Sequence, residues 1–138
     1  MKPIYLLIII LMFSCDRNEK SNKFIKNNEF ISEPGIYYHK STKVIVKEFK
    51  DGSLIYGIAD KRNNIIYQQS INQSFSDNGS WMIFIDTKDN IWFYTSDLQL
   101  TTVLVKQSET SSYVYKKITD NNTDIPNKMK SKMEVNKN

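Results

Sequence analysis

The chain has 138 residues, of which 40% are hydrophobic and 12% aromatic, and its formal net charge is +4. This length corresponds to one domain, and the apolar content is sufficient for a hydrophobic core. The central residues 30–118 carry ten basic and nine acidic side chains, interspersed along the sequence. A nucleic-acid-binding domain would concentrate Lys and Arg on one face, so the charge pattern argues against nucleic acid as a partner.

The first fourteen residues have the organisation of a signal peptide. Lys2 supplies a positive charge, Ile4 to Phe13 are apolar and uncharged, and Ser14 is small. Ten helical residues span about 15 Å, roughly half of the hydrocarbon core of a bilayer. The segment is therefore too short for a comfortable transmembrane helix, and residues 1–14 are predicted to be a signal peptide.

The single cysteine refines this prediction. Leu11 to Cys15 resembles the lipobox of bacterial lipoprotein signal peptides, in which a small residue precedes the lipidated cysteine. The resemblance implies that Cys15 is diacylated on its sulfur, that the preceding peptide is removed, and that the new amino terminus is acylated. Several acyl chains give stable membrane attachment where a single chain is marginal. An ordinary secretory signal with an incidental cysteine and an uncleaved anchor remain as alternatives.

Polar segments flank the centre of the chain. Residues 15–29 and 119–138 are rich in Asn, Lys, Ser and Asp and poor in large apolar side chains. Such segments bury too little surface to offset the entropy lost on ordering. We therefore expect a lipidated Cys15 followed by a flexible linker to residue 29, an all-β domain over residues 30–118, and a disordered polar tail over residues 119–138.

The central residues read as short strands separated by turns. Runs rich in Ile, Val, Tyr, Phe and Trp alternate with Gly, Asn and Asp, as in β-hairpins. The expected strands are Ile36–His39, Val44–Phe49, Leu54–Ala59, Ile65–Gln69, Trp81–Asp86, Ile91–Thr95, Thr102–Lys106 and Tyr113–Ile118. They predict an all-β fold, a small antiparallel meander of about eight strands that forms a sandwich or a partly closed barrel.

Two of these strands are apolar on both faces. Trp81–Ile85 and Ile91–Tyr94 do not alternate between apolar and polar residues. A strand of this kind requires cover on both sides, so they are central in a sandwich, form part of a barrel wall, or expose one face for an interaction.

The hairpin between these two strands has a recognisable turn. Phe84 to Ser96 resembles a hairpin of the extracellular β-propeller repeats of bacterial sensor proteins. A propeller needs several four-stranded blades, and residues 30–118 suffice for about two, so a propeller is rejected. Asp86 and Asn90 are nevertheless expected to hydrogen-bond the backbone of a tight turn.

The sequence offers little for catalysis or metal binding. Asp86, Asp89 and Asp97 lack the spacing of a calcium loop, and His39 is the only histidine. A zinc cluster and a specific Ser-His-Asp pattern are both missing from the sequence. We therefore expect no catalytic residue, metal site or small-molecule cofactor, and we expect the protein not to be an enzyme.

The aromatic residues suggest a binding role. Tyr and Trp are favoured at protein interfaces because one part of the ring system is apolar and another hydrogen-bonds. Tyr67, Trp92 and Tyr94 are the candidate partner-binding residues. The alternative interpretation is that the aromatic side chains form cross-strand pairs that stabilise a thin sandwich.

Together these features predict a lipoprotein of the bacterial cell envelope, facing the periplasm or the cell surface. Its partners would be the membrane, through the lipid on Cys15, and another protein bound by the β domain. A sharper version is an immunity protein that neutralises a toxin acting in the periplasm, because inhibition requires only a complementary surface. The alternative is a structural or accessory lipoprotein of an envelope assembly.

Overall fold

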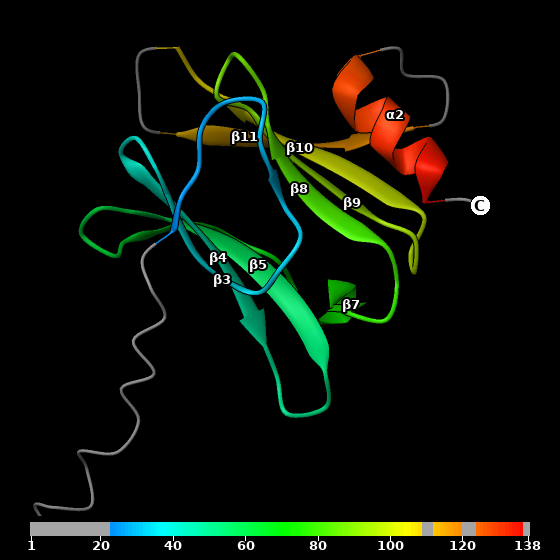
Figure 1. Cartoon of the computed structure of the whole chain (residues 1–138). Coiled ribbons are helices and arrows are strands. Elements are labelled where there is room, and N and C mark those ends of the chain that lie inside the picture. The colour runs from blue at the N-terminus through cyan, green and yellow to red at the C-terminus, as the bar shows by residue number, and fades with distance from the viewer. Residues whose placement is uncertain (1–22, 109–111, 120–123, 137–138) are drawn as a thin grey trace, which may run out of the picture.

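The computed structural model describes residues 23–108, 112–119 and 124–136, and its strands form two sheets packed face to face (Figure 1). In sheet A the strand order is β1-β3-β4-β5-β6, with β7 paired to β5; in sheet B it is β11-β10-β9-β8-β2. Sheet A comprises β1 (Lys23–Phe24), β3 (Gly35–His39), β4 (Thr42–Glu48), β5 (Ser53–Asp60), β6 (Ile65–Gln68) and β7 (Phe75–Ser76). Sheet B comprises β2 (Phe30–Ile31), β8 (Trp81–Ile85), β9 (Ile91–Thr95), β10 (Leu100–Lys106) and β11 (Tyr113–Ile118).

The all-β prediction is confirmed as a sandwich-like arrangement, and the described strands do not close into a barrel. Each of the eight expected strands is present, and antiparallel pairing runs from β3 to β6 and from β8 to β11. The strands that sequence reasoning missed, β1, β2 and β7, have two residues each, too few to show a period of two. Of these, β1 runs parallel to β3, so the fold is not purely antiparallel.

The main core lies between the two sheets. Alternate residues of the central strands point into it, including Val44 and Val46 from β4, and Ile83 and Phe93 from β8 and β9. Each fully buried side chain of this size contributes about 1.5–3 kcal/mol relative to leaving it in water. This shared core fixes the two sheets as one unit.

Part of the tail that was expected to be disordered over residues 119–138 forms a helix. Helix α2 (Asn127–Val135) packs on the outer face of sheet B (Figure 1), where Met129 is fully buried and Met133 is partly buried. These two methionines are four residues apart and therefore share one face of the helix. The polar composition of the tail led to a wrong expectation of disorder, because two apolar side chains are enough for a short helix to pack on a sheet that is already rich in apolar residues.

Part of the segment expected to be a flexible linker, residues 15–29, is instead ordered. From Lys23 onward the chain belongs to the domain: Lys23 and Phe24 pair with β3, Ile25 is buried, and the side chain of Asn27 is hydrogen-bonded. The predicted signal peptide, residues 1–14, and Cys15 lie outside the described residues. Within the described part, no helix has the length and apolar character needed to cross a membrane.

Candidate binding surfaces

The three predicted partner-binding residues do not form one surface. Trp92 and Tyr94 are buried on the outer face of sheet B, in the cluster that includes Met129 of α2. Trp92 Nε1 also donates a hydrogen bond to Asp86 Oδ2 at 2.9 Å. Tyr67 belongs to sheet A and is packed against the main core instead. The three residues therefore share no exposed patch, because the tail helix, which composition did not reveal, covers Trp92 and Tyr94.

Tyr67 lies where the edges of the two sheets meet. Its ring stacks on Tyr115 of β11 with centroids 5.9 Å apart and 15° between planes, and lies 5.5 Å from the ring of buried Tyr56. Partial burial is the main cause that raises the pKa of Tyr67, and the neighbouring Tyr115 hydroxyl is the second. The phenol therefore stays neutral and can donate a hydrogen bond at physiological pH. The stack connects the end strand of sheet A to the end strand of sheet B.

The strand β11 is an exposed edge. Among the described strands it pairs only with β10, and Val114 and Tyr115 remain 46% and 40% exposed. The next two residues, Lys116 and Lys117, are exposed as well. We name this edge strand, together with Tyr67, the tyrosine edge; Tyr115 and Lys117 lie on one face of β11, and Val114 and Lys116 lie on the other. It combines stacked aromatic rings, an apolar side chain, positive charge and a strand edge.

A second surface is the outer face of sheet A, which we name the open face. Strand alternation and the register place a largely apolar set of side chains on it. The set consists of Phe24, Ile36, Tyr38, Lys43, Ile45, Lys47, Ile55, Gly57, Ala59, Ile65 and Gln68. Three of them protrude: Phe24 is 81%, Ile65 68% and Ile36 36% exposed.

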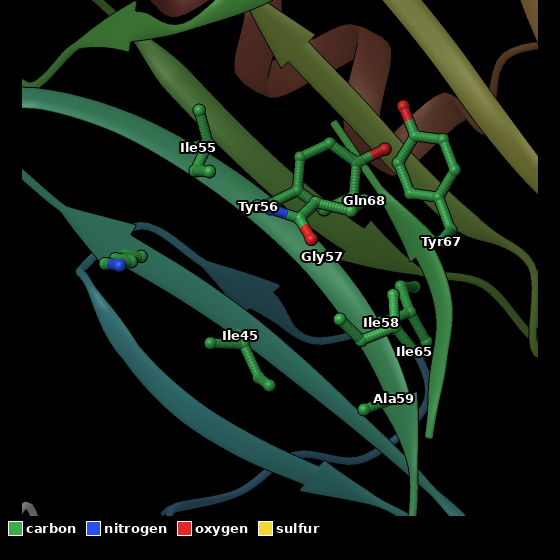
Figure 2. Close-up of a pocket in the computed structure, with 10 residues that line it drawn as sticks. Ile45, Ile55, Tyr56, Gly57, Ile58, Ala59, Ile65, Tyr67 and Gln68 are labelled. Carbon is green, nitrogen blue, oxygen red and sulfur yellow. The ribbon is translucent and has the colours of Figure 1, made fainter. Parts of the chain in front are cut away.

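A shallow hollow lies near the centre of the open face (Figure 2). Ile45, Ile55 and Ile65 surround it, and Gly57 and Ala59 contribute little side-chain bulk. At Gly57 an added Cβ would lie 3.1 Å from the backbone oxygen of Tyr67, so close strand packing favours glycine there. The cavity volume is about 120 Å³. This is below the range of about 300–1,000 Å³ typical of small-molecule sites, so the face is suited to surface contact rather than to enclosing a ligand.

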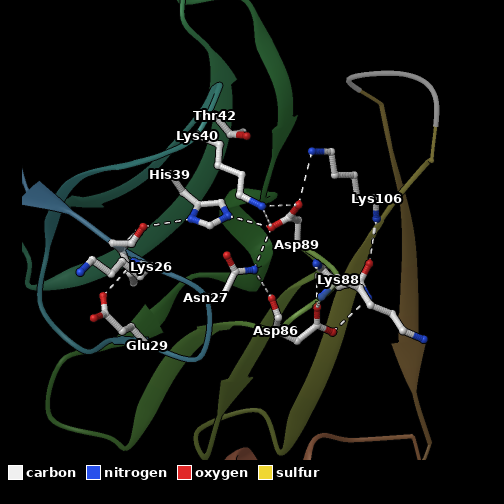
Figure 3. A network of polar contacts seen from close by, with 12 residues as sticks. Lys26, Asn27, Glu29, His39, Lys40, Thr42, Asp86, Lys88, Asp89 and Lys106 are labelled. Carbon is white, nitrogen blue, oxygen red and sulfur yellow. Dashed lines mark hydrogen bonds and ion pairs between the residues drawn. The ribbon is translucent and has the colours of Figure 1, made fainter.

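A polar network joins the loops at one end of the sandwich (Figure 3). The ring of buried His39 contacts the backbone oxygen of Ile25 through Nδ1 at 3.0 Å and Asp89 Oδ1 through Nε2 at 3.1 Å. The amide of Asn27 donates to the same Asp89 oxygen at 2.8 Å, and Lys40 Nζ donates to both oxygens of Asp89 at 2.7 and 2.9 Å. Both ring nitrogens of His39 therefore already have partners inside the protein.

The electrostatics of the network are those of a structural cluster. Burial by itself raises the pKa of Asp89, but hydrogen bonds from Lys40, Asn27 and His39, with the charge of Lys40, hold the pKa well below its usual value. Neither nitrogen of His39 is directed at solvent, so the ring is poorly placed to exchange a proton with a substrate. Among the described residues, no group of three or more His, Cys, Asp and Glu side chains could hold a metal ion.

The turn interactions expected of Asp86 are confirmed, whereas the side chain of Asn90 donates to Asp86 Oδ2 at 3.0 Å and accepts from the backbone nitrogen of Lys106 in β10 at 3.0 Å. Asp86 Oδ1 accepts hydrogen bonds from the backbone nitrogens of Lys88 and Asn90 at 2.8 and 3.0 Å. The β5–β6 turn repeats this arrangement, with Asp60 Oδ1 accepting from Arg62 and Asn64 at 2.8 and 2.9 Å. These aspartates are used to close hairpins, as side chains at such turns commonly are.

A second hollow, of about 590 Å³, lies between the first residues of α2 and the β8–β9 turn. Its described lining includes Lys88, Lys116 and Lys128 together with Asp86 and Asp124. Because charges of both signs line it, the hollow selects no particular ligand charge.

Comparison with protein-family models, with curated proteins and with solved structures finds no match to this chain. The function must therefore be argued from the surfaces themselves.

Proposed function

We propose that this chain is a lipid-anchored protein of the bacterial envelope whose β domain binds a protein partner without carrying out catalysis. The observation that carries the binding proposal is the tyrosine edge. Tyr115 of β11 stacks on Tyr67 of β6, and Tyr115 and Val114 are exposed on opposite faces of β11, whose outer side is unpaired among the described strands.

The anchor rests on the sequence around Cys15. The apolar run, the small Ser14 and the cysteine that follows resemble a lipobox, and the described domain contains no thiol that would compete for another role. Lipid on Cys15 would hold the domain close to the bilayer, since eight positions separate Cys15 from Lys23, an extended distance of at most about 29 Å.

The binding mode that fits the tyrosine edge is strand addition. An edge strand offers backbone N–H and C=O groups to an extended segment of a partner, and side chains beside the strand supply specificity. Tyr67 and Tyr115 are rigid aromatic residues of the kind that contribute strongly to binding. Lys116 and Lys117 favour a partner segment with acidic residues, because complementary charge speeds association and fixes register.

An immunity protein against a periplasmic toxin is the specific form of this proposal, since blocking a toxin needs a complementary surface and no active site. In that case, deletion of the gene sensitises cells to the toxin of a competing strain, and restoring the full chain protects them. Recovery of the protein in a stable envelope complex, with no change in sensitivity, would instead identify an accessory subunit.

The test is crosslinking of the full chain in membranes, followed by affinity capture and mass spectrometry. The double variant Val114→Asp/Tyr115→Ala is expected to lower partner recovery about tenfold or more, because it removes the exposed apolar and aromatic contacts. The matched variant Lys43→Glu/Lys47→Glu alters the open face and should leave recovery unchanged. Equal recovery from both variants and the unaltered chain would contradict binding at the tyrosine edge. The mass of the peptide containing Cys15 tests the anchor, and an unmodified residue 15 would refute it.

A further inference from the structure

The proposed binding at the tyrosine edge does not involve the open face of sheet A. The outer face of sheet B is also apolar, but α2 covers it. No described element packs over the open face, and Phe24, Ile36 and Ile65 protrude from it. Solvent-exposed apolar groups gathered on one face commonly mark an interaction surface.

The charges on the open face are of one sign. Lys43 and Lys47 point outward from β4, and no Asp or Glu is among the outward-facing residues of β1 and β3 to β6. Lys43 Nζ lies 5.6 Å from the centroid of the Tyr38 ring, and Lys47 Nζ lies 5.2 Å from that of Phe49. The lysine stems therefore lie along aromatic surface with their ammonium groups near the apolar residues. Apolar side chains interleaved with lysines are the composition of a surface that contacts anionic lipid.

The course of the chain points to the same partner. The described structure begins at Lys23 in β1, which is an end strand of sheet A, and Phe24 contacts Tyr38 on the open face with ring centroids 5.8 Å apart. A tether attached near β1 brings this side of the sandwich to the surface that holds the tether. The tyrosine edge includes β11 of sheet B, which is not part of the open face.

We propose that the open face lies on the headgroups of an anionic phospholipid bilayer, with Phe24, Ile36 and Ile65 reaching toward the acyl chains and Lys43 and Lys47 contacting lipid phosphates. The inference rests on the proposed function in one respect, the lipid on Cys15 that keeps the domain within reach. On their own, three exposed apolar side chains and two lysines would bind a bilayer only weakly. When the lipid on Cys15 already holds the domain at the membrane, these contacts are enough to orient it. The orientation leaves β11 accessible to a protein partner.

Tryptophan depth measurements test this orientation. The full chain, reconstituted in vesicles of phosphatidylethanolamine and phosphatidylglycerol, is compared for the variants Phe24→Trp and Ile65→Trp and the control Leu98→Trp. Leu98 is also exposed, at 46%, but lies between β9 and β10. Trp81 and Trp92 are buried and give a constant background. Brominated acyl chains should quench the two open-face tryptophans and leave the control unchanged. Equal quenching at all three positions, or none, would overturn the proposal.

A charge test separates lipid from protein as the occupant. In the Phe24→Trp background, Lys43→Glu/Lys47→Glu should lower quenching of the introduced indole toward that of the Leu98→Trp control, whereas the matched Lys116→Glu/Lys117→Glu should not. Replacing phosphatidylglycerol with phosphatidylcholine should weaken the signal similarly. If the open-face tryptophans respond only when a captured protein partner is added, the face is a protein interface and the proposal is wrong. Failure here leaves partner capture at the tyrosine edge unaffected, so the two proposals fail separately.

Discussion

The outer faces of the two sheets differ in what covers them. On sheet B, α2 lies over large side chains, among them Phe84, Trp92 and Tyr94. On sheet A, the corresponding face holds Ile45 and Ile55 beside Gly57 and two lysines, and no described element packs over it. Large aromatic side chains on both sides of a strand require burial, whereas a face that mixes lysine with smaller apolar residues tolerates contact with water or headgroups. The same architecture thus leaves one face closed and the other available.

Removing the cover of sheet B is expected to have the largest effect. Met129→Ala should lower the free energy of unfolding by about 2–4 kcal/mol, because the buried methionine leaves a cavity between α2 and sheet B. Urea denaturation measures the loss, and the emission of Trp92 should shift to longer wavelength as water reaches it. Met133→Ala, at a partly buried position on the same helix face, should cost less. Equal losses for the two variants would contradict the central position of Met129.

The β8–β9 turn of sheet B and the β5–β6 turn of sheet A allow the covered and the open sheet to be compared at equivalent aspartates. Asp86→Ala removes the acceptor for two turn amides and for buried Trp92, and should cost about 2–3 kcal/mol. Asp60→Ala removes the same turn bonds at an exposed site, where water replaces the lost acceptor, and should cost clearly less. Denaturation of both variants in parallel gives the difference. A larger loss for Asp60→Ala would show that the covered face contributes nothing to this turn.

Acid should weaken the network around Asp89. Its pKa is lowered in the folded protein, so the carboxylate contributes stability that is present above the usual carboxyl value near 3.8 and is lost as the pH falls below it. The substitution Asp89→Asn should fit the backbone of the β8–β9 turn. Asn63 occupies the equivalent position of the β5–β6 turn with a similar positive φ, which asparagine tolerates. The variant should be less stable at pH 7 and lose less stability between about pH 5 and pH 3, as measured by urea denaturation. An unchanged pH dependence would show that Asp89 is not the responsible group.

The smallest change in stability is expected on the open face. Ile65→Ser should alter the free energy of unfolding by no more than about 0.5 kcal/mol, because the side chain is already largely in water. In the Phe24→Trp background, the same variant in anionic vesicles should show weaker quenching of the introduced indole by brominated acyl chains. A stability loss comparable to that of Met129→Ala would mean that the open face is covered in solution.

Much of the fold could be predicted from local pattern. The eight longer strands follow from runs of β-branched and aromatic residues, and the Asp-Asn turns follow from side chains that bond their own backbone. The short strands and α2 could not be predicted, because two-residue pairings carry no period and the tail is polar on average. The candidate binding residues divide in the same way: Tyr67 stacks on Tyr115 at the edge of the sandwich, while Trp92 and Tyr94 are buried by a helix distant in sequence.

The sequence by itself determined the class of fold, the position of the hairpin turns and the lipobox-like segment that ends at Cys15, because each depends on residues close together in the chain. Only the tertiary structure decided which apolar face is covered, since that depends on residues 127–135 returning to β8 and β9. It also decided that Tyr67 meets Tyr115 and that His39 meets Asp89 across 48 and 50 positions of sequence. Contacts over such separations follow from the packing of whole sheets, which no short window of sequence encodes.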